Sequence, residues 1–246
     1  MRILLTNDDG YAALGLNAVA SLLKDNHEVV VVAPDVQKSA YSRAITMRTP
    51  IACKEIYGYD YKVYSVCGTP TDCVKIGCQL LFKNPDLVIS GINDGENLGS
   101  DIWYSGTVGA AAEAAYLGCR AIALSIDKRG ATAEEIGRFV KFLGENLNSL
   151  VDAELPKRTF LNINYPSCEP KGVKIVKMNT QQTFFDEFVA AGDNLYSMKG
   201  CRNFESLDRR TDEWYCHDGY VTITPILCDC TDYSAVKSLK NKEFKI

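Results

Sequence analysis

The sequence predicts a doubly wound α/β domain with a mostly parallel sheet. Short, wholly apolar runs alternate along the chain with segments in which apolar residues recur every three or four positions, a pattern typical of buried strands and of the helices that cover them. The first strand, helix and strand are complete by residue 34, and such a βαβ unit has parallel strands and a right-handed crossover. A chain of 246 residues is long enough for one large domain with a full core.

The individual strands and helices follow in order from these patterns. A strand that includes Ile3, Leu4 and Leu5 opens the chain, and a helix over residues 13–25 covers it. Further strands of the main sheet are expected over residues 28–33, 86–90, 121–125, 159–164 and 172–178. Further helices are expected from Thr69 to Phe82, from Val108 to Gly118 and, capped by Thr132, through Leu147. This alternation of strands and helices is typical of a Rossmann-like fold.

The segment before the helix at Thr69 is less regular. Residues 45–47, 51–54 and 61–66 are expected to be extended pieces. In the helix itself Thr69 is the expected N-cap, with Pro70 at the first helical position. The residues that this helix is expected to bury are Cys73, Gly77, Leu80 and Leu81.

We expect a catalytic core over residues 1–178 and a C-terminal part over residues 179–246. Residues 179–218 are rich in aromatic side chains and show no regular pattern. They form either an excursion that packs on another subunit, and so serves oligomerisation, or an aromatic-anchored loop that packs on its own domain. A return strand is expected over residues 220–227, and a terminal helix over residues 233–239.

Composition and charge restrict the class of function. A formal net charge of −4 and a pI near 5.3 argue against binding to polymeric nucleic acid, but they are compatible with a small phosphorylated ligand. No apolar run approaches the ~18 residues of a membrane span, and no secretory signal is recognised, so we expect a cytoplasmic protein without membrane association. The ten cysteines include no CxxC pair, and we expect buried free thiols rather than a zinc site or disulfides.

Three of the expected strands end in polar loops. Asn7-Asp8-Asp9-Gly10 follows the first strand, Ser39 lies in the loop after the second, and Asn93 and Asn97 follow the strand at 86–90. In a parallel sheet all carboxyl ends lie at one edge, where such folds bind ligands. The adjacent carboxylates indicate either a solvated Asp-Asp-Gly turn or a divalent-metal site, and the convergence of three polar strand ends favours the metal site.

The donor atoms available at this edge are carboxylate, hydroxyl and amide oxygens, which suit Mg²⁺, Mn²⁺ or Ca²⁺ better than Zn²⁺. Beside them Ser105-Gly106-Thr107 begins a helix, and the free N–H groups of a helix N-terminus favour a phosphate. Adjacent side chains on a strand point in opposite directions, so Asp8 and Asp9 are not expected to contact a metal in the same way.

Five ordered motifs are similar to those of a known family. They are Asn7-Asp8-Asp9-Gly10, Ala33-Pro34-Asp35 to Ser39, Gly68-Thr69-Pro70-Thr71-Asp72-Cys73, Ser90-Gly91-Ile92-Asn93-x-Gly95-x-Asn97 and Tyr104-Ser105-Gly106-Thr107-Val108. The similarity continues through Thr211-Asp212, Asp218-Gly219-Tyr220-Val221 and Thr224-Pro225. Over nearly its whole length the chain resembles the SurE (survival protein E) family of nucleoside-monophosphate phosphatases.

The resemblance implies a site and an activity. The family's divalent-metal ligands are matched by Asp8, Asp9, Ser39 and Asn93, and its phosphate-contacting residues by Asn97, Ser105, Gly106 and Thr107. Family members hydrolyse nucleoside 5′- and 3′-monophosphates, usually with Mg²⁺ or Mn²⁺. We therefore expect one such ion per subunit, attack by a metal-activated water, and Asp8 or Asp9 as a base. Family members form homodimers or homotetramers partly by exchanging C-terminal segments, which favours the intersubunit interpretation of residues 179–218.

The sequence departs from the family pattern beside the site. Ala40 stands where the family usually has Gly, Tyr41-Ser42-Arg43 replaces a common Ala-Ser-Asn, and residues 11–14 lack the usual Pro before Gly15. None of these positions is a matched metal ligand, so the departures bear on substrate preference rather than on activity.

Two other classes of protein also place acidic residues after a first strand. A haloacid-dehalogenase-like phosphatase forms a covalent aspartyl phosphate and has an Asp-x-Asp pattern, whereas the two carboxylates here are adjacent. A receiver-type signalling domain needs a phosphoacceptor Asp and a Lys at the ends of later strands, where this chain has Ser90 and Ser125. Both alternatives fit the sequence less well than a metal-dependent phosphatase.

Overall fold

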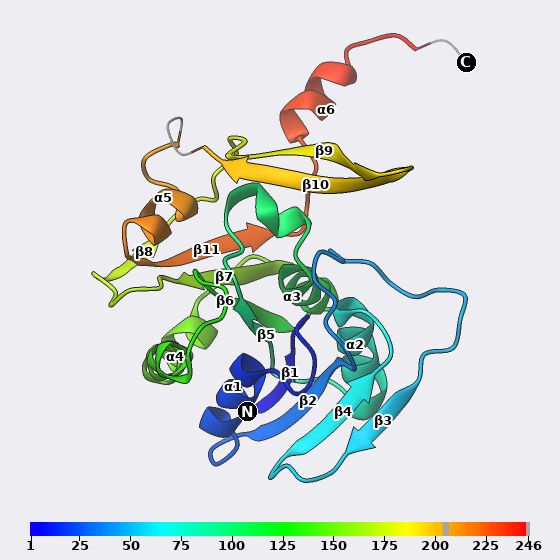
Figure 1. Ribbon diagram of the computed structural model, residues 1–246, viewed down its shortest axis with the longest axis vertical. Helices are drawn as coiled ribbons and strands as arrows, with labels where there is room; N and C mark the ends of the chain where they lie inside the picture. Colours follow the sequence, from blue (N-terminus) through cyan, green and yellow to red (C-terminus); the bar gives the residue numbers. More distant parts are fainter. Residues whose placement is uncertain (204–206, 245–246) are drawn as a thin grey trace.

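The computed structural model of the protein describes residues 1–203 and 207–244 (Figure 1). Within these residues the centre is a nine-stranded sheet with the strand order β3-β4-β2-β1-β5-β6-β7-β11-β8. Its strands are β1 (Arg2–Thr6), β2 (Glu28–Pro34), β3 (Cys53–Ile56), β4 (Lys62–Val66), β5 (Leu87–Asp94), β6 (Arg120–Ile126), β7 (Thr159–Tyr165), β8 (Val173–Ile175) and β11 (Val221–Leu227). Neighbouring strands are parallel except at β3–β4 and β7–β11, which confirms the predicted doubly wound α/β class.

Helices cover both faces of this sheet (Figure 1). The helices of the described residues are α1 (Leu14–Leu23), α2 (Pro70–Ile76), α3 (Gly106–Tyr116), α4 (Ala133–Asp152), α5 (Asp212–His217) and α6 (Tyr233–Leu239). Side chains of β1 alternate between the faces, so that Ile3 and Leu5 pack with α1 and α4 while Leu4 packs with α2 and α3. All three are fully buried, and each such side chain contributes roughly 1.5–3 kcal/mol of hydrophobic stabilisation.

The predicted helix starts are confirmed by their caps. Thr69 Oγ1 accepts a hydrogen bond from Asp72 N (3.1 Å), and Asp72 Oδ2 accepts one from Thr69 N (3.0 Å), so the two residues form a capping box. Thr132 and Glu135 form the same motif at the start of α4. Each cap stabilises its helix by about 1 kcal/mol.

The helix that begins at Pro70 does not continue unchanged to Phe82. It ends at Ile76 and is followed by a π-helical turn over Gly77–Leu81. The wider turn rotates the side chains away from α-helical positions, and Leu80 is therefore 68% exposed, contrary to the prediction that it is buried.

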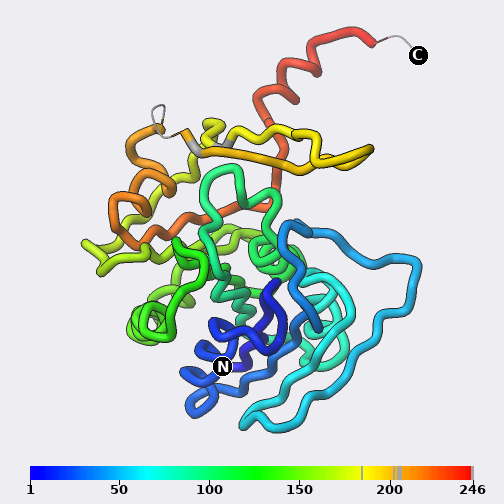
Figure 2. Tube along the Cα trace, in the orientation of Figure 1, coloured from blue at the N-terminus to red at the C-terminus, as the bar shows by residue number. Residues whose placement is uncertain are grey.

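The connection between β2 and β3, residues 35–52, runs along one side of the molecule (Figure 2). Residues 45–47, which were expected to be an extended piece, belong to no strand. Instead, Thr46 donates two hydrogen bonds to the carboxylate of Asp72, from its N (3.0 Å) and its Oγ1 (2.7 Å). Thr69 Oγ1 donates to Ala44 O (2.7 Å), which fastens the same stretch to the start of α2.

A buried ion cluster fastens this connection to α3. The Glu113 carboxylate is almost fully buried and lies 2.7 Å from Arg43 Nη2 and 3.1 Å from Lys75 Nζ. The Arg43 guanidinium also lies over the ring of Tyr116, at 4.9 Å from its centroid. The connection that carries Ser39 is thus held against the helix that begins at Gly106.

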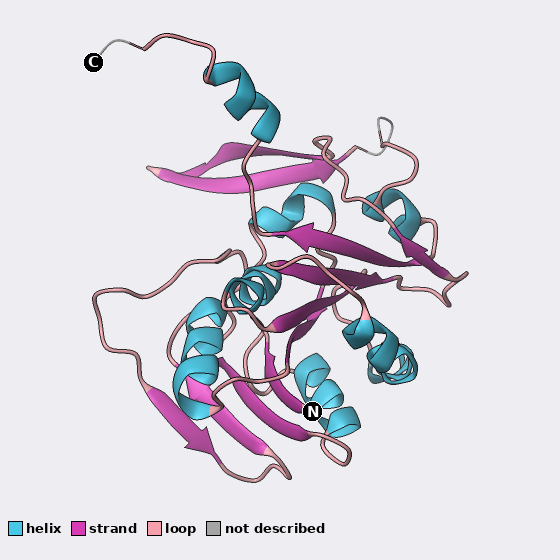
Figure 3. Ribbon diagram, turned by 180° about the vertical axis from the view of Figure 1, so that it is seen from behind, coloured by secondary structure: helices cyan, strands magenta, loops and turns pink. Residues whose placement is uncertain are grey.

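The C-terminal part is more regular than the sequence predicted. A hairpin of β9 (Phe184–Gly192) and β10 (Leu195–Arg202) lies with α6 at one end of the molecule, as Figures 1 and 3 show. The predicted return strand is β11, which takes its place in the main sheet between β7 and β8. Residues 204–206, which fall within the predicted excursion, lie outside the described residues.

Two further sequence predictions are corrected in part. The strand expected over residues 172–178 is confined to Val173–Ile175. All ten cysteines are free, as expected, but only Cys73 and Cys216 are buried, and five of the others are exposed. Among the described residues, no helix combines the length and the apolar character needed to cross a membrane.

Candidate functional site

Polar segments from the sequence analysis meet at the carboxyl edge of the sheet. They follow β1, β2 and β5, which are neighbours in the strand order, and the start of α3 joins them. A cavity of about 340 Å³ opens there, within the size range of small-molecule sites. The predicted site residues that line it are Asp8, Ser39, Asn93, Asn97 and Ser105.

The remaining three predicted residues lie beside this cavity. Thr107 contacts Asp8, and Gly106 packs directly against the Asp8 side chain. Asp9 lines a second, neighbouring cavity of about 280 Å³, and Asn93 lines both. The two adjacent carboxylates therefore face different spaces, as expected, although they lie in a bend after β1 and not in the strand itself.

The Asn7-Asp8-Asp9-Gly10 stretch is held in shape by its own first residue. Asn7 Nδ2 donates to Gly10 O (3.0 Å), and Asn7 Oδ1 accepts from Gly10 N (3.1 Å). Gly10 has a φ of 102°, which favours glycine, and the Asp8 carbonyl accepts a hydrogen bond from Lys38 N (2.7 Å). The stretch is thus a turn that also presents two carboxylates, so the turn and the metal site are not exclusive alternatives.

Asp8 is a buried carboxylate, with 4% of its surface exposed. Its Oδ1 accepts a hydrogen bond from Thr107 Oγ1 (2.5 Å), and this hydroxyl lies 3.5 Å from Asn93 Oδ1. Burial raises the pKa of the Asp8 carboxyl to about 6, the Asp9 charge adds to the rise, and the Thr107 hydrogen bond opposes it. A buried carboxylate in this state is stabilised by any cation that binds beside it.

Asp9 is less enclosed than Asp8. Its Oδ1 accepts from Gln37 Nε2 and its Oδ2 from Asp94 N, both at 3.3 Å. Burial also raises the pKa of Asp9, and the charge of Asp94 adds to this effect. Hydrogen bonds of this length are weak, so the Asp9 carboxylate keeps the capacity to bind a cation.

The donor set fits a hard divalent cation. Two carboxylates, one amide and one hydroxyl, from Asp8, Asp9, Asn93 and Ser39, gather at adjoining cavities. Oxygen donors of these types suit Mg²⁺ and Mn²⁺. Among the described residues, no group of three or more His, Cys, Asp or Glu side chains is placed to hold a metal ion.

The backbone beside Ser39 is strained. Ala40 has a φ of 61°, in the left-handed region that favours glycine. Holding a residue with a side chain there costs about 1–2 kcal/mol. Contacts further along the connection offset this cost, since Ser42 N donates to Tyr104 O (2.9 Å) and Ser42 Oγ to Trp103 O (2.7 Å).

The start of α3 supplies the candidate phosphate site. Ser105 is the N-cap, and its Oγ accepts from Val108 N (3.1 Å), which leaves the N–H groups of Gly106 and Thr107 without partners inside the helix. A Cβ at Gly106 would lie 2.9 Å from Asp8 Cβ, so only glycine lets the helix begin this close to the carboxylate. The positive end of the helix dipole therefore points to the space beside Asp8.

Asn97 is positioned by residues that the sequence analysis missed. Its side-chain Nδ2 donates to Ser125 Oγ (2.7 Å), and its backbone N donates to Asn164 Oδ1 (2.8 Å). Its carbonyl accepts from Asn162 Nδ2 (2.8 Å) and Asn164 Nδ2 (3.0 Å). These residues could have been found from the sequence, because Ser125, Asn162 and Asn164 are polar side chains within β6 and β7, two strands that are otherwise largely apolar.

Arg129 is a second residue that the sequence analysis missed. It lies in the loop between β6 and α4 and lines the 340 Å³ cavity together with Asp8 and Asn93. The signal was again available, because residues 128 and 129 are basic and follow a predicted strand whose carboxyl end lies at the same edge.

Asp212 fastens the loop after Asn97 to the C-terminal part. This fully buried carboxylate accepts hydrogen bonds from Gly99 N (3.0 Å), Asn179 N (2.7 Å) and Glu213 N (2.8 Å). Three segments distant in sequence thus share one side chain, which makes Asp212 a structural support of the site.

The Asp212→Asn variant is expected to lose about 2–4 kcal/mol of unfolding free energy, because its NH₂ group faces a backbone N–H that it cannot accept from. Urea denaturation of both proteins measures the loss. Asp208→Asn is the matched control, since Asp208 forms an exposed ion pair with Lys177, and its removal is expected to change stability by less than about 1 kcal/mol. Equal stability of the two variants would contradict the support role.

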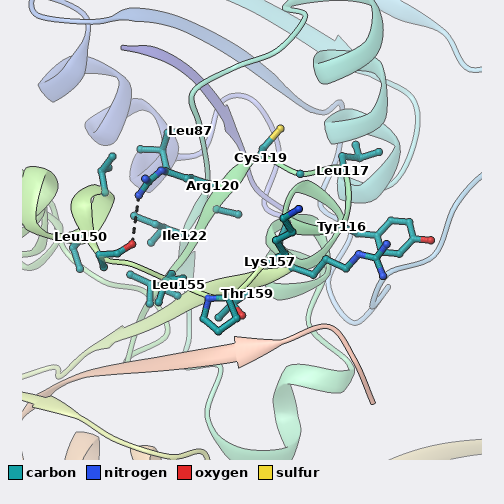
Figure 4. A pocket seen from close by; sticks show the side chains of 18 of the residues that line it. Leu87, Tyr116, Leu117, Cys119, Arg120, Ile122, Leu150, Leu155, Lys157 and Thr159 are labelled. Carbon is teal, nitrogen blue, oxygen red and sulfur yellow. Dashed lines mark hydrogen bonds between the residues drawn. The ribbon is translucent and has the colours of Figure 1, made fainter. Parts of the chain in front are cut away.

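A larger cavity lies elsewhere (Figure 4). It has a volume of about 660 Å³ and opens at the amino ends of β5, β6 and β7, where Leu87, Arg120 and Thr159 line it. Arg120 Nη1 donates to Ala153 O (3.5 Å), just past the end of α4, so this cation is used to satisfy a helix terminus. The cavity lies at the edge opposite to Asp8, and we assign it no part in the chemistry.

The chain is similar to proteins of one known family. The family model described as Survival protein SurE matches residues 3–185. The chain is 44% identical to the 5′-nucleotidase SurE of Thermoanaerobacter pseudethanolicus over all of both chains, and 41% identical to that of Clostridium beijerinckii over 97% of this chain and 98% of the relative. The crystal structure of the SurE protein from Aquifex aeolicus matches with a TM-score of 0.83 and 35% identity, over 97% of this chain and 98% of that one.

Proposed function

The chain belongs to the SurE family, and on that premise we propose that it is a nucleotidase that hydrolyses nucleoside monophosphates to nucleoside and phosphate. The observation that carries the proposal is the buried Asp8 carboxylate, which faces a cavity bordered by the N-terminus of α3. The Asp8 carboxylate would repel a phosphate bound at the start of α3. A cation that lies between the two compensates both negative charges and so lets one ligand occupy the cavity.

We propose that this cation is one Mg²⁺ or Mn²⁺ ion per subunit, held by Asp8, Asp9, Ser39 and Asn93. When bound, such an ion neutralises phosphate charge and activates water for attack on phosphorus. Burial raises the pKa of both Asp8 and Asp9, which supports this assignment because a cation beside them would compensate the buried negative charge.

The chain's own residues bind and orient the substrate. The N–H groups of Gly106 and Thr107 donate to phosphate oxygens, and Asn97 and Ser105 border the same space. One of the two carboxylates accepts the proton of the attacking water, and the leaving ribose oxygen lies in line with the attack. Uncatalysed monoester hydrolysis is so slow that accelerations up to ~10²¹ are needed, so electrostatic stabilisation by this donor set carries much of the barrier reduction.

The proposed substrates include both 5′- and 3′-monophosphates. The relatives are named 5′-nucleotidases, and this supports the 5′ assignment for the present chain. The extension to 3′-monophosphates comes from the resemblance of the site motifs. A cytoplasmic location stays a prediction from the sequence.

We also propose that the protein is a homodimer or homotetramer and that residues 179–246 provide the contacts. The hairpin exposes large apolar side chains, among them Phe188 (70%), Tyr196 (70%) and Met198 (58%). No residue of α6 is buried, and Tyr233 and Leu239 are more than half exposed. Apolar surface of this kind at one end of the molecule supports packing on another subunit over packing on its own domain.

The proposed activity is tested with a substrate panel. Purified protein is expected to release phosphate from nucleoside 5′- and 3′-monophosphates with Mg²⁺ or Mn²⁺, and EDTA is expected to stop release until excess metal is added. Phosphate release is measured with and without each metal. Turnover that survives EDTA treatment, or a trapped phosphoaspartate, would contradict the metal mechanism and favour a covalent aspartyl phosphatase.

A further inference from the structure

Arg129 lies at the candidate active site but belongs to none of the motifs that define it. It lies in the loop of residues 127–132, between the end of β6 and the start of α4. This loop leaves the sheet at the same edge as the loops that carry Asp8 and Asn93, and Arg129 lines the cavity with both.

The backbone that follows Arg129 is held in place. Asp94 Oδ2 accepts from Gly130 N (2.9 Å), and Asp94 Oδ1 accepts from Ala131 N (3.0 Å). Lys128, which precedes Arg129, does not line the cavity, and its Nζ lies 2.7 Å from Glu135 Oε1. The backbone position of Arg129 is therefore held by Asp94, the residue after Asn93 at the end of β5.

Gly95 is bordered by the side chains of both Arg129 and Asn93. It has a φ of 130°, and a Cβ built there would make ordinary contacts with Arg129 Cγ (3.7 Å), Arg129 Nε (3.8 Å) and Asn93 Nδ2 (3.9 Å). Arg129 therefore borders the same glycine as a proposed metal ligand. Because Arg129 is exposed, its side chain has room to reach a ligand in the cavity.

Arg129 is the cation in the lining of the cavity. Asp8, Asp94, Glu96 and Asp101 also line it, and Arg129 is the one cation among the described residues that do so. Unlike Lys128, Arg129 forms no ion pair within the described residues. Its guanidinium therefore attracts a dianionic substrate that enters the cavity.

We propose that Arg129 is a substrate-binding residue that donates its guanidinium fork to the phosphoryl group of a dianionic phosphate monoester. Guanidinium groups bind phosphate through two parallel hydrogen bonds, which a lysine in the same place does not reproduce. The inference rests on the proposed function for its substrate, but the binding of phosphate itself can be measured without turnover.

The kinetic test compares Arg129→Ala with Lys128→Ala, a matched control that removes a neighbouring cation outside the cavity. Loss of hydrogen bonds to a charged group is expected to raise the KM of Arg129→Ala for nucleoside monophosphates by more than about tenfold, with a smaller change in kcat. Arg129→Lys is expected to lie between the parent and Arg129→Ala. Lys128→Ala is expected to keep the parent KM.

The binding test uses inorganic phosphate and isothermal titration calorimetry, with and without Mg²⁺, on the same proteins. Arg129→Ala is expected to bind phosphate more than about tenfold more weakly than both the parent and Lys128→Ala. Thermal melting confirms that all variants are folded.

The outcomes separate the two proposals. If the parent hydrolyses nucleotides but Arg129→Ala matches Lys128→Ala in KM and in phosphate affinity, the role of Arg129 is wrong and the proposed function stands. If the parent binds phosphate through Arg129 but hydrolyses no nucleoside monophosphate, the proposed function is wrong and Arg129 remains an anion-binding residue. If the parent neither binds phosphate nor turns over, both are wrong.

Discussion

The Asp9→Asn variant is expected to lose more than about 100-fold in kcat/KM for nucleoside monophosphates while it folds normally. Asparagine keeps the shape of Asp9, and its single oxygen can accept one of the two long hydrogen bonds, from Gln37 Nε2 or from Asp94 N. What the variant loses is a negative charge at the proposed metal site, and hence affinity for the ion. Steady-state kinetics across a Mg²⁺ titration measure the loss.

Asp25→Asn is the control for this variant. Asp25 is exposed in the turn between α1 and β2, at the amino edge of the sheet opposite to the site, and its substitution is expected to leave kcat/KM unchanged. If Asp9→Asn retained turnover within about twofold of the parent at every Mg²⁺ concentration, Asp9 would not be a metal ligand or a base.

The Gly106→Ala variant is expected to lose a similar factor, more than about 100-fold, by a different route. The added Cβ would lie 2.9 Å from Asp8 Cβ, 3.0 Å from Asp8 Oδ2 and 3.2 Å from Pro70 Cγ, so that the start of α3 or the Asp8 carboxylate must shift. Crowding of this kind also costs about 1–3 kcal/mol of stability. Kinetics and urea denaturation together measure both effects.

Gly137→Ala provides the matched control for this substitution. Gly137 lies inside α4, is exposed, and a Cβ there meets no atom within 4 Å. Alanine is therefore expected to keep activity and to raise stability by about 0.5–1 kcal/mol, because it favours the helix. Full activity of Gly106→Ala would show that the close approach to Asp8 does not matter for the chemistry.

The parts of the fold that the sequence predicted are those in which local pattern and tertiary burial agree. The apolar run at Ile3 to Leu5 is buried on both faces, and the Thr69 and Thr132 caps depend only on residues three positions away. Because the carboxyl ends of parallel strands lie at one edge, the sequence also predicted that Asp8, Ser39 and Asn93 lie close together, although they are far apart in sequence. All three line the same cavity.

The predictions that were wrong or incomplete depend on contacts that a local pattern does not contain. The hairpin of β9 and β10 has large exposed side chains such as Phe185 and Phe188, so it lacks the alternation that identifies a half-buried strand. Thr46 lies in an irregular connection because it bonds to Asp72 across 26 positions. Leu80 is exposed because the helix widens at Gly77, whose missing side chain allows close packing on Leu4.

The same reason explains the site residues that the sequence analysis missed. Asn164 acquires a role only because the Asn97 backbone lies against β7. Arg129 reaches the cavity only because Asp94 holds the following two backbone N–H groups. Neither set of hydrogen bonds produces a periodic pattern in the sequence, and both can be recognised only when the strand order is known.

The central position of β1 has a consequence for how the protein acquires its activity. Its neighbour β2 follows after one helix, but its other neighbour is β5, so that Leu5 pairs with Ile89. Closing so long a stretch of chain is entropically unfavourable and kinetically slow compared with local contacts. Asp8 and Asn93 come together only when this pairing forms. During refolding, catalytic activity is therefore expected to return only after β1 has paired with β5. The helical circular dichroism signal also includes helices that form earlier from local contacts.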